Sequence, residues 1–187
     1  MTNESTQYHL TLADDRAVIV RSTIATDYPA ISRLVQDNFA NDESYADLSS
    51  AARAAYIAAN SLAGITEVCD HPDNVVSLVA TTADTGAIVA FALYRRGKHL
   101  VTDEEVAEGK RLQIARSMKS QGLGNQLLGI VRQRLRELGF KKIVGYPSGA
   151  SLSYFEKQGR KPLVVQNNPA LAKQGVKIEA TYVEYLL

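Results

Sequence analysis

The fold is decided by the stretch from Leu112 to Leu128, which reads LQIARSMKSQGLGNQLL. Its first residues predict a strand, Gly122 and Gly124 predict a tight turn, and the leucines that follow predict a helix. The first amides of a helix have no partner inside the helix, and the helix dipole places partial positive charge there. Because glycine lets a phosphate approach the backbone closely, and Arg116 and Lys119 add full charges nearby, this turn predicts an anion cradle.

Charge is unevenly distributed around this stretch. The chain has 187 residues, with 21 Lys and Arg against 20 Asp and Glu, for a net charge of +1. Residues 1–109 carry 7 basic and 16 acidic side chains, whereas residues 110–142 carry 9 basic residues and one acidic residue. A segment this cationic in an otherwise acidic chain suggests an anionic ligand, although a solvated basic helix face would give the same count.

Length and composition predict one globular domain spanning residues 1–187, with residues 1–15 as a flexible or additional N-terminal segment. Hydrophobic residues make up 45% and charged residues 22%, which disfavours disordered and fibrous classes. No apolar run approaches the roughly 20 residues that span a bilayer, so no membrane partner is expected. The polar segment Met1–Thr11 has no signal-peptide pattern, and we therefore expect a cytoplasmic protein.

Cysteine and histidine give little support for other chemistry. One cysteine, Cys69, excludes an intramolecular disulfide framework and a Cys-rich metal site. It is expected to be an inert thiol, with an acyl-cysteine intermediate as the alternative. His9, His71 and His99 lack metal-ligand spacing and are expected on the surface or in loops, so no metal site is predicted.

Hydrophobic periodicity predicts an α/β (α+β) fold with a mixed sheet and helices on its faces. Residues 97–109 are expected to form a long polar connection, and Gly64 is expected to stop the second helix. Strands are predicted at about 17–21, 75–82, 87–94, 110–117, 142–146, 162–166 and 176–185. Helices are predicted at about 28–39, 47–62, from the glycine turn to 138, and at 151–158.

Two familiar phosphate-binding motifs fail in this chain. A Walker A loop needs Gly-Lys-Ser/Thr, but Asn125 follows Gly124. A Rossmann fingerprint needs a third glycine where Leu127 stands, and an acidic residue about 20 residues further on, near Lys141 and Lys142. Both classes of nucleotide-binding protein are therefore disfavoured.

Two motifs in the right order carry a family resemblance. The first is KSQGLG, residues 119–124, and the second is SGASLSYFEKQGR, residues 148–160. They resemble the Gln/Arg-x-x-Gly-x-Gly/Ala and Asn-x-x-Ala-x-x-x-Tyr-Glu-Lys-x-Gly-Phe motifs of the GCN5-related N-acetyltransferase (GNAT) family. Lys119 replaces Gln or Arg and loses the planar bidentate fork. Ser148, Phe155 and Arg160 stand at the Asn, Tyr and final Phe positions.

The resemblance implies a mixed, mostly antiparallel sheet of about seven strands with about four helices, and acetyl-CoA or coenzyme A as co-substrate. It also implies that the turn amides bind the pyrophosphate, while the strand edge pairs with the pantetheine arm. The residues predicted to bind the cofactor are Leu112, Ile114, Lys119, Ser120, Gln121, Gly122, Leu123, Gly124, Asn125, Ser148 and Phe155.

The implied chemistry is attack by a neutral amine on the thioester. It needs an oxyanion donor, for which a backbone amide near Ile114 is expected, together with a base and an acid. Glu108 is the predicted base, with Glu105 behind it. Because Phe155 has no proton to donate, Tyr154 and Tyr146 are the predicted acids.

The predicted function is therefore acetyl transfer from acetyl-CoA to a primary amine of a small, cationic molecule or a peptide. The net charge of −9 over residues 1–109 favours a cationic acceptor. The alternative is a non-catalytic acyl-CoA-binding domain with a regulatory or interaction role, which Phe155 and Ser148 favour. Family members are often dimers, so the resemblance also implies a homodimer.

Nucleic-acid binding is a third hypothesis. It would use the basic residues Arg132, Arg134, Arg136, Lys141 and Lys142. The sequence lacks interleaved aromatic residues and a recognisable motif, so no nucleic-acid partner is predicted.

Overall fold

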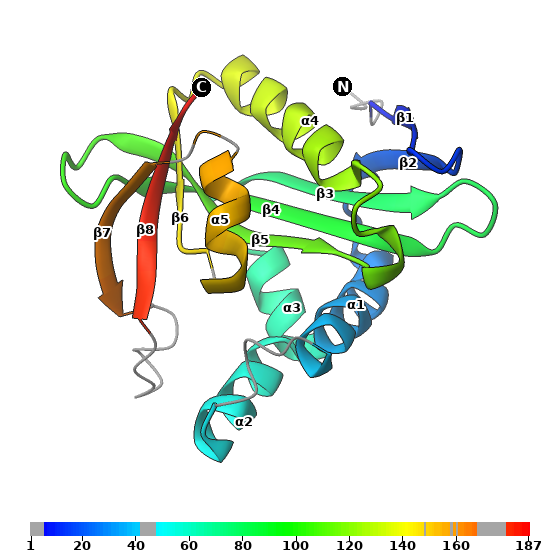
Figure 1. The fold of residues 1–187 in the computed structure, drawn as a ribbon, viewed down its shortest axis with the longest axis horizontal. Coiled ribbons are helices and arrows are strands. Elements are labelled where there is room, and N and C mark those ends of the chain that lie inside the picture. Colours follow the sequence, from blue (N-terminus) through cyan, green and yellow to red (C-terminus); the bar gives the residue numbers. More distant parts are fainter. Residues whose placement is uncertain (1–5, 42–47, 148, 158, 160, 168–178) are drawn as a thin grey trace.

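The computed structural model describes residues 6–41, 48–147, 149–157, 159, 161–167 and 179–187. A single sheet organises this part of the chain, with strand order β1-β2-β3-β4-β5-β6-β8-β7 (Figure 1). All neighbouring strands are antiparallel except β5 and β6, which are parallel. In chain order the elements are β1 (Tyr8–Thr11), β2 (Ala17–Ser22), a 3-10 turn (Ala25–Asp27), α1 (Tyr28–Ala40), α2 (Ser50–Ala59), α3 (Leu62–Cys69), β3 (Asn74–Thr82), β4 (Ile88–Lys98), β5 (Glu105–Ile114), a 3-10 turn (Arg116–Met118), α4 (Leu123–Glu137), β6 (Lys142–Gly145), α5 (Gly149–Lys157), β7 (Lys161–Asn167) and β8 (Glu179–Leu186).

Helices cover both faces of the sheet. α4 and α5 pack on one face, where Leu127, Leu128 and Phe155 join the main core cluster (Figure 1). α1 and α3 pack on the other face, where Ile31 and Ile65 contact residues of β3 and β4. The central strand β4 is buried continuously from Val89 to Tyr94 because both of its faces are covered.

The predicted fold class is confirmed, with one more strand than the roughly seven expected. Within residues 1–15, for which the sequence predicts a flexible or additional segment, β1 forms an edge strand against β2. It was missed because four residues are too few to show a convincing period-2 pattern.

Within the helix predicted over residues 47–62, α2 forms from Ser50 to Ala59, but a second helix that was not predicted, α3, begins at Leu62. The side chain of Ser61 caps α3 by accepting a hydrogen bond from the Gly64 amide at 3.2 Å. Gly64 does not stop a helix but lies inside α3. A Cβ there would lie 2.5 Å from the carbonyl oxygen of Ala59. Glycine is therefore needed for the close approach of the two helices.

The predicted long connection over residues 97–109 is also wrong. β4 continues to Lys98 and β5 already begins at Glu105, so that only residues 99–104 connect them. Charged residues in this hairpin pair across the strands, as Arg96 does with Glu105 at 2.5 Å, which explains why the segment reads as polar. His99 lies in the loop as expected, but it is buried rather than exposed.

A buried ion pair fixes the start of α1 and makes a testable contribution to stability. Asp27 accepts hydrogen bonds from both terminal nitrogens of Arg21, at 2.7 and 2.8 Å, and from the Ile24 amide at 2.9 Å. Burial opposes the charge, but these hydrogen bonds outweigh it and hold the pKa of Asp27 below its ordinary value of 3.8. Asp27→Asn should cost about 3 kcal/mol of unfolding free energy at neutral pH, because it leaves Arg21 without its anion.

The pH dependence of this effect has a definite sign. A lowered carboxyl pKa stabilises the protein at pH values above the ordinary pKa, and the stabilisation is lost as the pH falls through the lowered pKa. The difference in urea midpoint between wild type and Asp27→Asn should therefore shrink below about pH 3.8. A difference that stays constant from neutral pH into acid would contradict the ion pair.

Candidate functional site

The two parallel strands at the centre of the sheet separate part of the way along. β5 pairs with β6 only through Ala107, Glu108 and Gly109, after which β6 ends while β5 continues to Ile114. Figure 1 shows β6 and β8 running at a steep angle to β5. The last residues of β5 therefore have an edge that β6 does not cover.

The polar groups on this open edge can be assigned from the pairing on the other side. The amide of Ala115 donates to the Val89 carbonyl at 2.8 Å, toward β4. Because backbone groups alternate in direction along a strand, the amides of Leu112 and Ile114 point to the open edge. Both side chains pack against the core beneath α4 and α5. The edge can accept an extended, amide-bearing ligand as an added strand.

A β-bulge lies where the two strands part. Leu93 pairs with Arg111 but Tyr94 pairs with Gly109, so Lys110 is an additional residue in β5. A bulge bends its strand and changes the direction of nearby side chains. It thus marks the point at which the open edge begins.

Asn38 of α1 reaches this edge from the other face of the sheet. Its Nδ2 donates to the Ile114 carbonyl at 3.1 Å and to Oε1 of Gln113 at 2.8 Å. A pocket of about 230 Å³ opens here between α1 and the segment after β5, lined in part by Asn38 and Arg116. Sequence analysis did not assign Asn38 to the site. The available signal was a polar residue within the apolar stripe of a predicted helix.

Beyond the open edge, β5 leads through the 3-10 turn into the start of α4. Ser120 and Gly122 have positive φ angles of 63° and 82°, the left-handed region. The Gly122 carbonyl accepts a bond from the Gln126 amide at 3.1 Å, so the amides of Leu123 to Asn125 precede the first intrahelical donor. The first turn contains no acidic side chain. This end of the helix therefore carries uncompensated positive partial charge, as an anion cradle requires.

The hairpin between β1 and β2 braces this turn. Arg16 donates to the Ser117 carbonyl at 2.9 Å, and the Ala13 amide donates to the Gln121 carbonyl at 3.3 Å. The two partners of the first bond are 101 residues apart in the chain. No local pattern in the sequence could have indicated this support.

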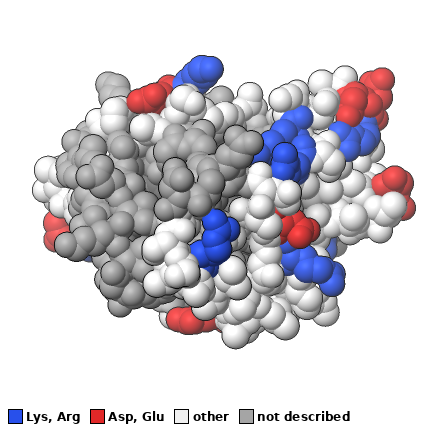
Figure 2. Space-filling model, turned by 60° about the horizontal axis from the view of Figure 1, so that its bottom comes forward, with Lys and Arg blue, Asp and Glu red and all other residues white. Residues whose placement is uncertain are grey.

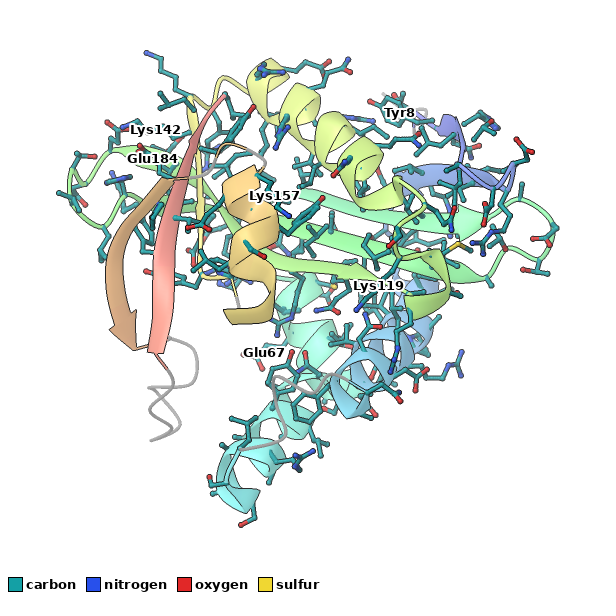
Figure 3. The ribbon with its side chains drawn as sticks, in the orientation of Figure 1. Tyr8, Glu67, Lys119, Lys142, Lys157 and Glu184 are labelled. Atoms are coloured by element: carbon teal, nitrogen blue, oxygen red, sulfur yellow. The ribbon has the colours of Figure 1, made fainter. Side chains whose placement is uncertain are left out.

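The basic segment, residues 110–142, has fewer free cations than its nine basic residues imply. Arg132 stacks on the ring of Tyr185 at 4.2 Å, and Arg134 donates to the hydroxyl of Tyr8 at 3.0 Å. Lys119 is exposed on the loop between β5 and α4 and makes no ion pair within the described residues (Figure 3). It lies next to the predicted cradle in sequence and can supply a full charge there.

Lys142, at the start of β6, is also engaged within the protein. Its Nζ lies 2.5 Å from Glu104 and 3.3 Å from Glu184, which Figure 3 shows beside it. The positive charge of this lysine is therefore neutralised at the far end of the sheet from the turn.

Tyr154 of α5 reaches the start of α4. Its hydroxyl donates to Oδ1 of Asn125 at 2.9 Å, and a Cβ on Gly124 would lie 3.1 Å from the same hydroxyl. Its neighbour Phe155 turns into the core and is only 9% exposed. One helical step of about 100° separates the two rings, so the tyrosine faces the turn while the phenylalanine supports α5 from beneath.

Tyr146 lies elsewhere. It packs in a small cluster with Val106, Val144 and Tyr182, and its ring centroid is 5.2 Å from that of Tyr182. Val106 precedes Ala107, which belongs to the core under α4 and α5, so this cluster is on the opposite face of the sheet from Tyr154. The predicted cofactor ligand Ser148 is outside the described residues.

Glu108 is held beside the start of the open edge. Its carboxylate forms an ion pair with Lys110. Its Oε2 also lies close to Gly97 of β4, only 3.2 Å from the position that a Cβ on this glycine would occupy. The other predicted base, Glu105, is half exposed and pairs with Arg96 near the hairpin end. The structure thus places Glu108, rather than Glu105, next to the point where β5 and β6 separate.

Cys69 is poorly suited to nucleophilic chemistry. Burial, together with the nearby charge of Asp70, raises the pKa of its thiol to about 11. Almost none of it is thiolate at neutral pH, which disfavours the acyl-cysteine alternative.

Within the described residues, no three His, Cys, Asp or Glu side chains gather as a possible metal site. None of the helices described is long and apolar enough to span a bilayer.

These features match a known class of protein. The model of the acetyltransferase (GNAT) family matches residues 39–159, which is well over half of the chain. The chain therefore belongs to the GNAT acetyltransferase family.

Solved structures share the fold at low sequence identity. A GCN5-related N-acetyltransferase from Rhodopseudomonas palustris is 14% identical, with a TM-score of 0.71 over 97% of this chain and 99% of that one. The PaiA N-acetyltransferase from Thermoplasma acidophilum, in complex with coenzyme A, is 15% identical, with a TM-score of 0.68 over 91% and 99%. A phosphinothricin acetyltransferase from Sinorhizobium meliloti, in complex with AcCoA, is 15% identical, with a TM-score of 0.62 over 95% and 89%. No curated protein sequence matches the chain.

Proposed function

We propose that this protein transfers an acetyl group from acetyl-CoA to a primary amine. The observation that supports this most directly is the continuity of the open edge of β5 with the uncapped start of α4. A pantetheine arm carries amides that can pair with a strand edge, and its pyrophosphate can bind helix amides. Both kinds of partner follow one another here along a single segment of chain.

The residues present fit such a co-substrate. Leu112 and Ile114 offer backbone amides at the open edge. The carbonyl of Ile114 already accepts a hydrogen bond from the side chain of Asn38. The amides of residues 121–125 and the ammonium group of Lys119 offer positive charge for phosphates. Acetyl-CoA would supply the activated acyl carbon as a thioester, while the protein would orient it and manage two protons.

The proposed reaction is direct acyl transfer. The nitrogen of a neutral amine forms a bond to the thioester carbon, the bond from that carbon to sulfur breaks, and coenzyme A leaves. Glu108 accepts the proton that the amine loses, and Tyr154 donates a proton to the departing thiolate. Tyr154 is proposed for this role because it adjoins Phe155, the position of the family's tyrosine, and packs against the same core cluster as Leu112 and Ile114 of the open edge.

The acceptor is proposed to be a primary amine of a small molecule or a peptide. A cationic acceptor was inferred from the acidic count of residues 1–109, but several of these acids have basic partners. Asp27, Glu104 and Glu105 are all in ion pairs. Figure 2 shows Lys and Arg side chains interspersed with Asp and Glu over the described part of one face. The count alone therefore does not define an acidic acceptor site.

A non-catalytic acyl-CoA-binding domain is the second candidate. The specific observation in its favour is Phe155, which is buried and has no hydroxyl at the position of the family's tyrosine. A thiol-release assay with acetyl-CoA and a broad amine panel separates the two candidates, with calorimetry to measure acetyl-CoA binding. Binding with amine-dependent thiol release supports the enzyme. Binding without thiol release for any amine supports the second candidate, and the absence of binding contradicts both.

Tyr154→Phe tests the proposed acid. The change should lower kcat about 100-fold while leaving acetyl-CoA affinity within a few fold, because only the proton donor is removed. Tyr146→Phe is the matched control, since it removes the other predicted hydroxyl from the opposite face of the sheet. A large loss in Tyr146→Phe combined with normal turnover by Tyr154→Phe would reverse the assignment.

The cytoplasmic location and the homodimer stay predictions.

A further inference from the structure

Two arginines lie together on the face of the sheet that α1 and α3 cover. Arg111 of β5 is directly opposite Leu93 of β4, and Leu93 packs in the core of this face. Arg95 is two residues beyond Leu93 on the same strand, so its side chain leaves the sheet on the same side. Both side chains are half-buried.

Neither guanidinium has an anionic partner within the described residues. Arg95 donates only to neutral oxygens, Oδ1 of Asn74 and the Val68 carbonyl, each at the long distance of 3.3 Å. Arg111 donates to the Lys110 carbonyl at 3.0 Å, and its Nε is buried without a hydrogen-bond partner. Burial without an anion is costly for such groups.

The two charges also oppose one another. Burial lowers the pKa of Arg95 and is the largest effect, and the charge of Arg111 contributes in the same direction, while the charges of Glu108, Asp73 and Glu67 act against both. Glu108 is directly opposite Arg95 in the sheet, but its carboxylate is already in an ion pair with Lys110. None of these carboxylates forms an ion pair with Arg95 or Arg111 among the described residues.

The position of the pair connects it to acyl transfer. Arg111 adjoins the bulge at Lys110, where the open edge of β5 begins, and Arg95 is the cross-strand neighbour of the proposed base. The proposed phosphate cradle begins only at Lys119 and lies against α4. On a strand, adjacent residues face opposite sides, so Arg111 points away from the face that holds Leu112, α4 and α5. The phosphates of coenzyme A are thus not the natural partner of this pair.

We propose that Arg95 and Arg111 bind a carboxylate of the acceptor, so that the preferred substrate is an amino acid or a similarly short molecule bearing both an amine and a carboxylate. This inference rests on the proposed function. Side chains that are direct cross-strand neighbours have Cβ atoms only about 5 Å apart. An amine at Glu108 and a carboxylate at the arginines must therefore be separated by few bonds. The planar fork of arginine matches a carboxylate in two-point hydrogen bonding.

The test compares amines that differ only in the carboxylate. The standard amino acids and their carboxamides are assayed as acceptors with wild type, Arg111→Gln, Arg95→Gln and Arg136→Gln. Arg136 is the control because it is exposed on α4, on the other face of the sheet. For the preferred amino acid, wild type should favour the acid over its amide at least about 10-fold in kcat/KM. Arg111→Gln and Arg95→Gln should each reduce that ratio about 10-fold, toward equal turnover of acid and amide, through KM, with acetyl-CoA affinity unchanged.

Arg111→Lys retains the charge without the fork and should keep part of the preference, which separates a ligand contact from a folding defect. Equal turnover of acids and amides by wild type, or an unchanged ratio in both Gln variants, would overturn the proposal. In that case Arg95 only caps α3 through the Val68 carbonyl, and its loss lowers the melting temperature alone. Should no amine be acetylated, the proposed function fails separately. Calorimetry then tests the arginine site by binding alone, comparing N-acetyl amino acids with the corresponding N-acetyl amides. Equal affinity for the acids and the amides would contradict a carboxylate site.

Discussion

Gly124→Asp is expected to lower the affinity for acetyl-CoA at least about 100-fold, to the limit of calorimetric detection. The new carboxylate would stand in the first turn of α4, where the proposed pyrophosphate site needs positive charge and room. Its Cβ would also come within 3.1 Å of the Tyr154 hydroxyl. The protein should stay folded, because an acidic side chain at a helix N-terminus is favourable by about 0.3–1 kcal/mol.

Gly129→Asp provides a matched control for this experiment. It makes the same substitution in the same helix at an exposed position, where an added Cβ would meet nothing within 4 Å. It should bind acetyl-CoA as wild type does. Undiminished binding by Gly124→Asp, or an equal loss in both variants, would be incompatible with a cradle at the start of α4.

Glu108→Gln is expected to lower kcat about 100- to 1,000-fold at neutral pH, because the amine would lose its proton acceptor. The residual rate should rise with pH as free amine accumulates, approaching a limit near the acceptor pKa of about 10. The pH profile of kcat/KM, measured for one amine on both proteins, checks this. Acetyl-CoA affinity should change little, since Glu108 precedes the open edge of β5.

Glu105→Gln is the matched control for Glu108→Gln. It removes a carboxylate from the same strand, but from a half-exposed pair with Arg96 near the hairpin end. Its activity should stay within about 2-fold of wild type. If both glutamine variants are equally active, neither carboxylate is the base, and water or another group must accept the proton.

Local rules were enough to predict the segment around Gly122. A strand, a glycine turn and an amphipathic helix follow one another in sequence, and helix amides are exposed at the start of any helix whatever lies around it. The apolar stripe predicted for this helix is buried at Leu127, Leu128, Val131 and Leu135, whereas its last member, Leu138, follows the end of α4 and is 56% exposed. Family membership was equally readable, because its motifs are short and contiguous in the chain.

Contacts between distant segments could not be predicted in the same way. The boundary between α2 and α3 depends on the approach of Gly64 to the Ala59 carbonyl, which sequence periodicity does not encode. The length of β5 was underestimated because its charged residues are neutralised by partners on β4 and within the strand itself. Burial and pairing across a sheet overrode the local polar appearance of residues 97–109.

By itself, then, the sequence determined most of the order of the elements, the glycine turn that opens α4 and the family. The tertiary structure decided which side chains meet there. It turned Tyr154 toward Asn125 and Phe155 into the core, and it brought Arg95 and Arg111 to one face beside Glu108. The reason is physical: backbone amides at a helix start need only local geometry, whereas the environment of a side chain depends on strand register, bulges and packing between segments far apart in the chain.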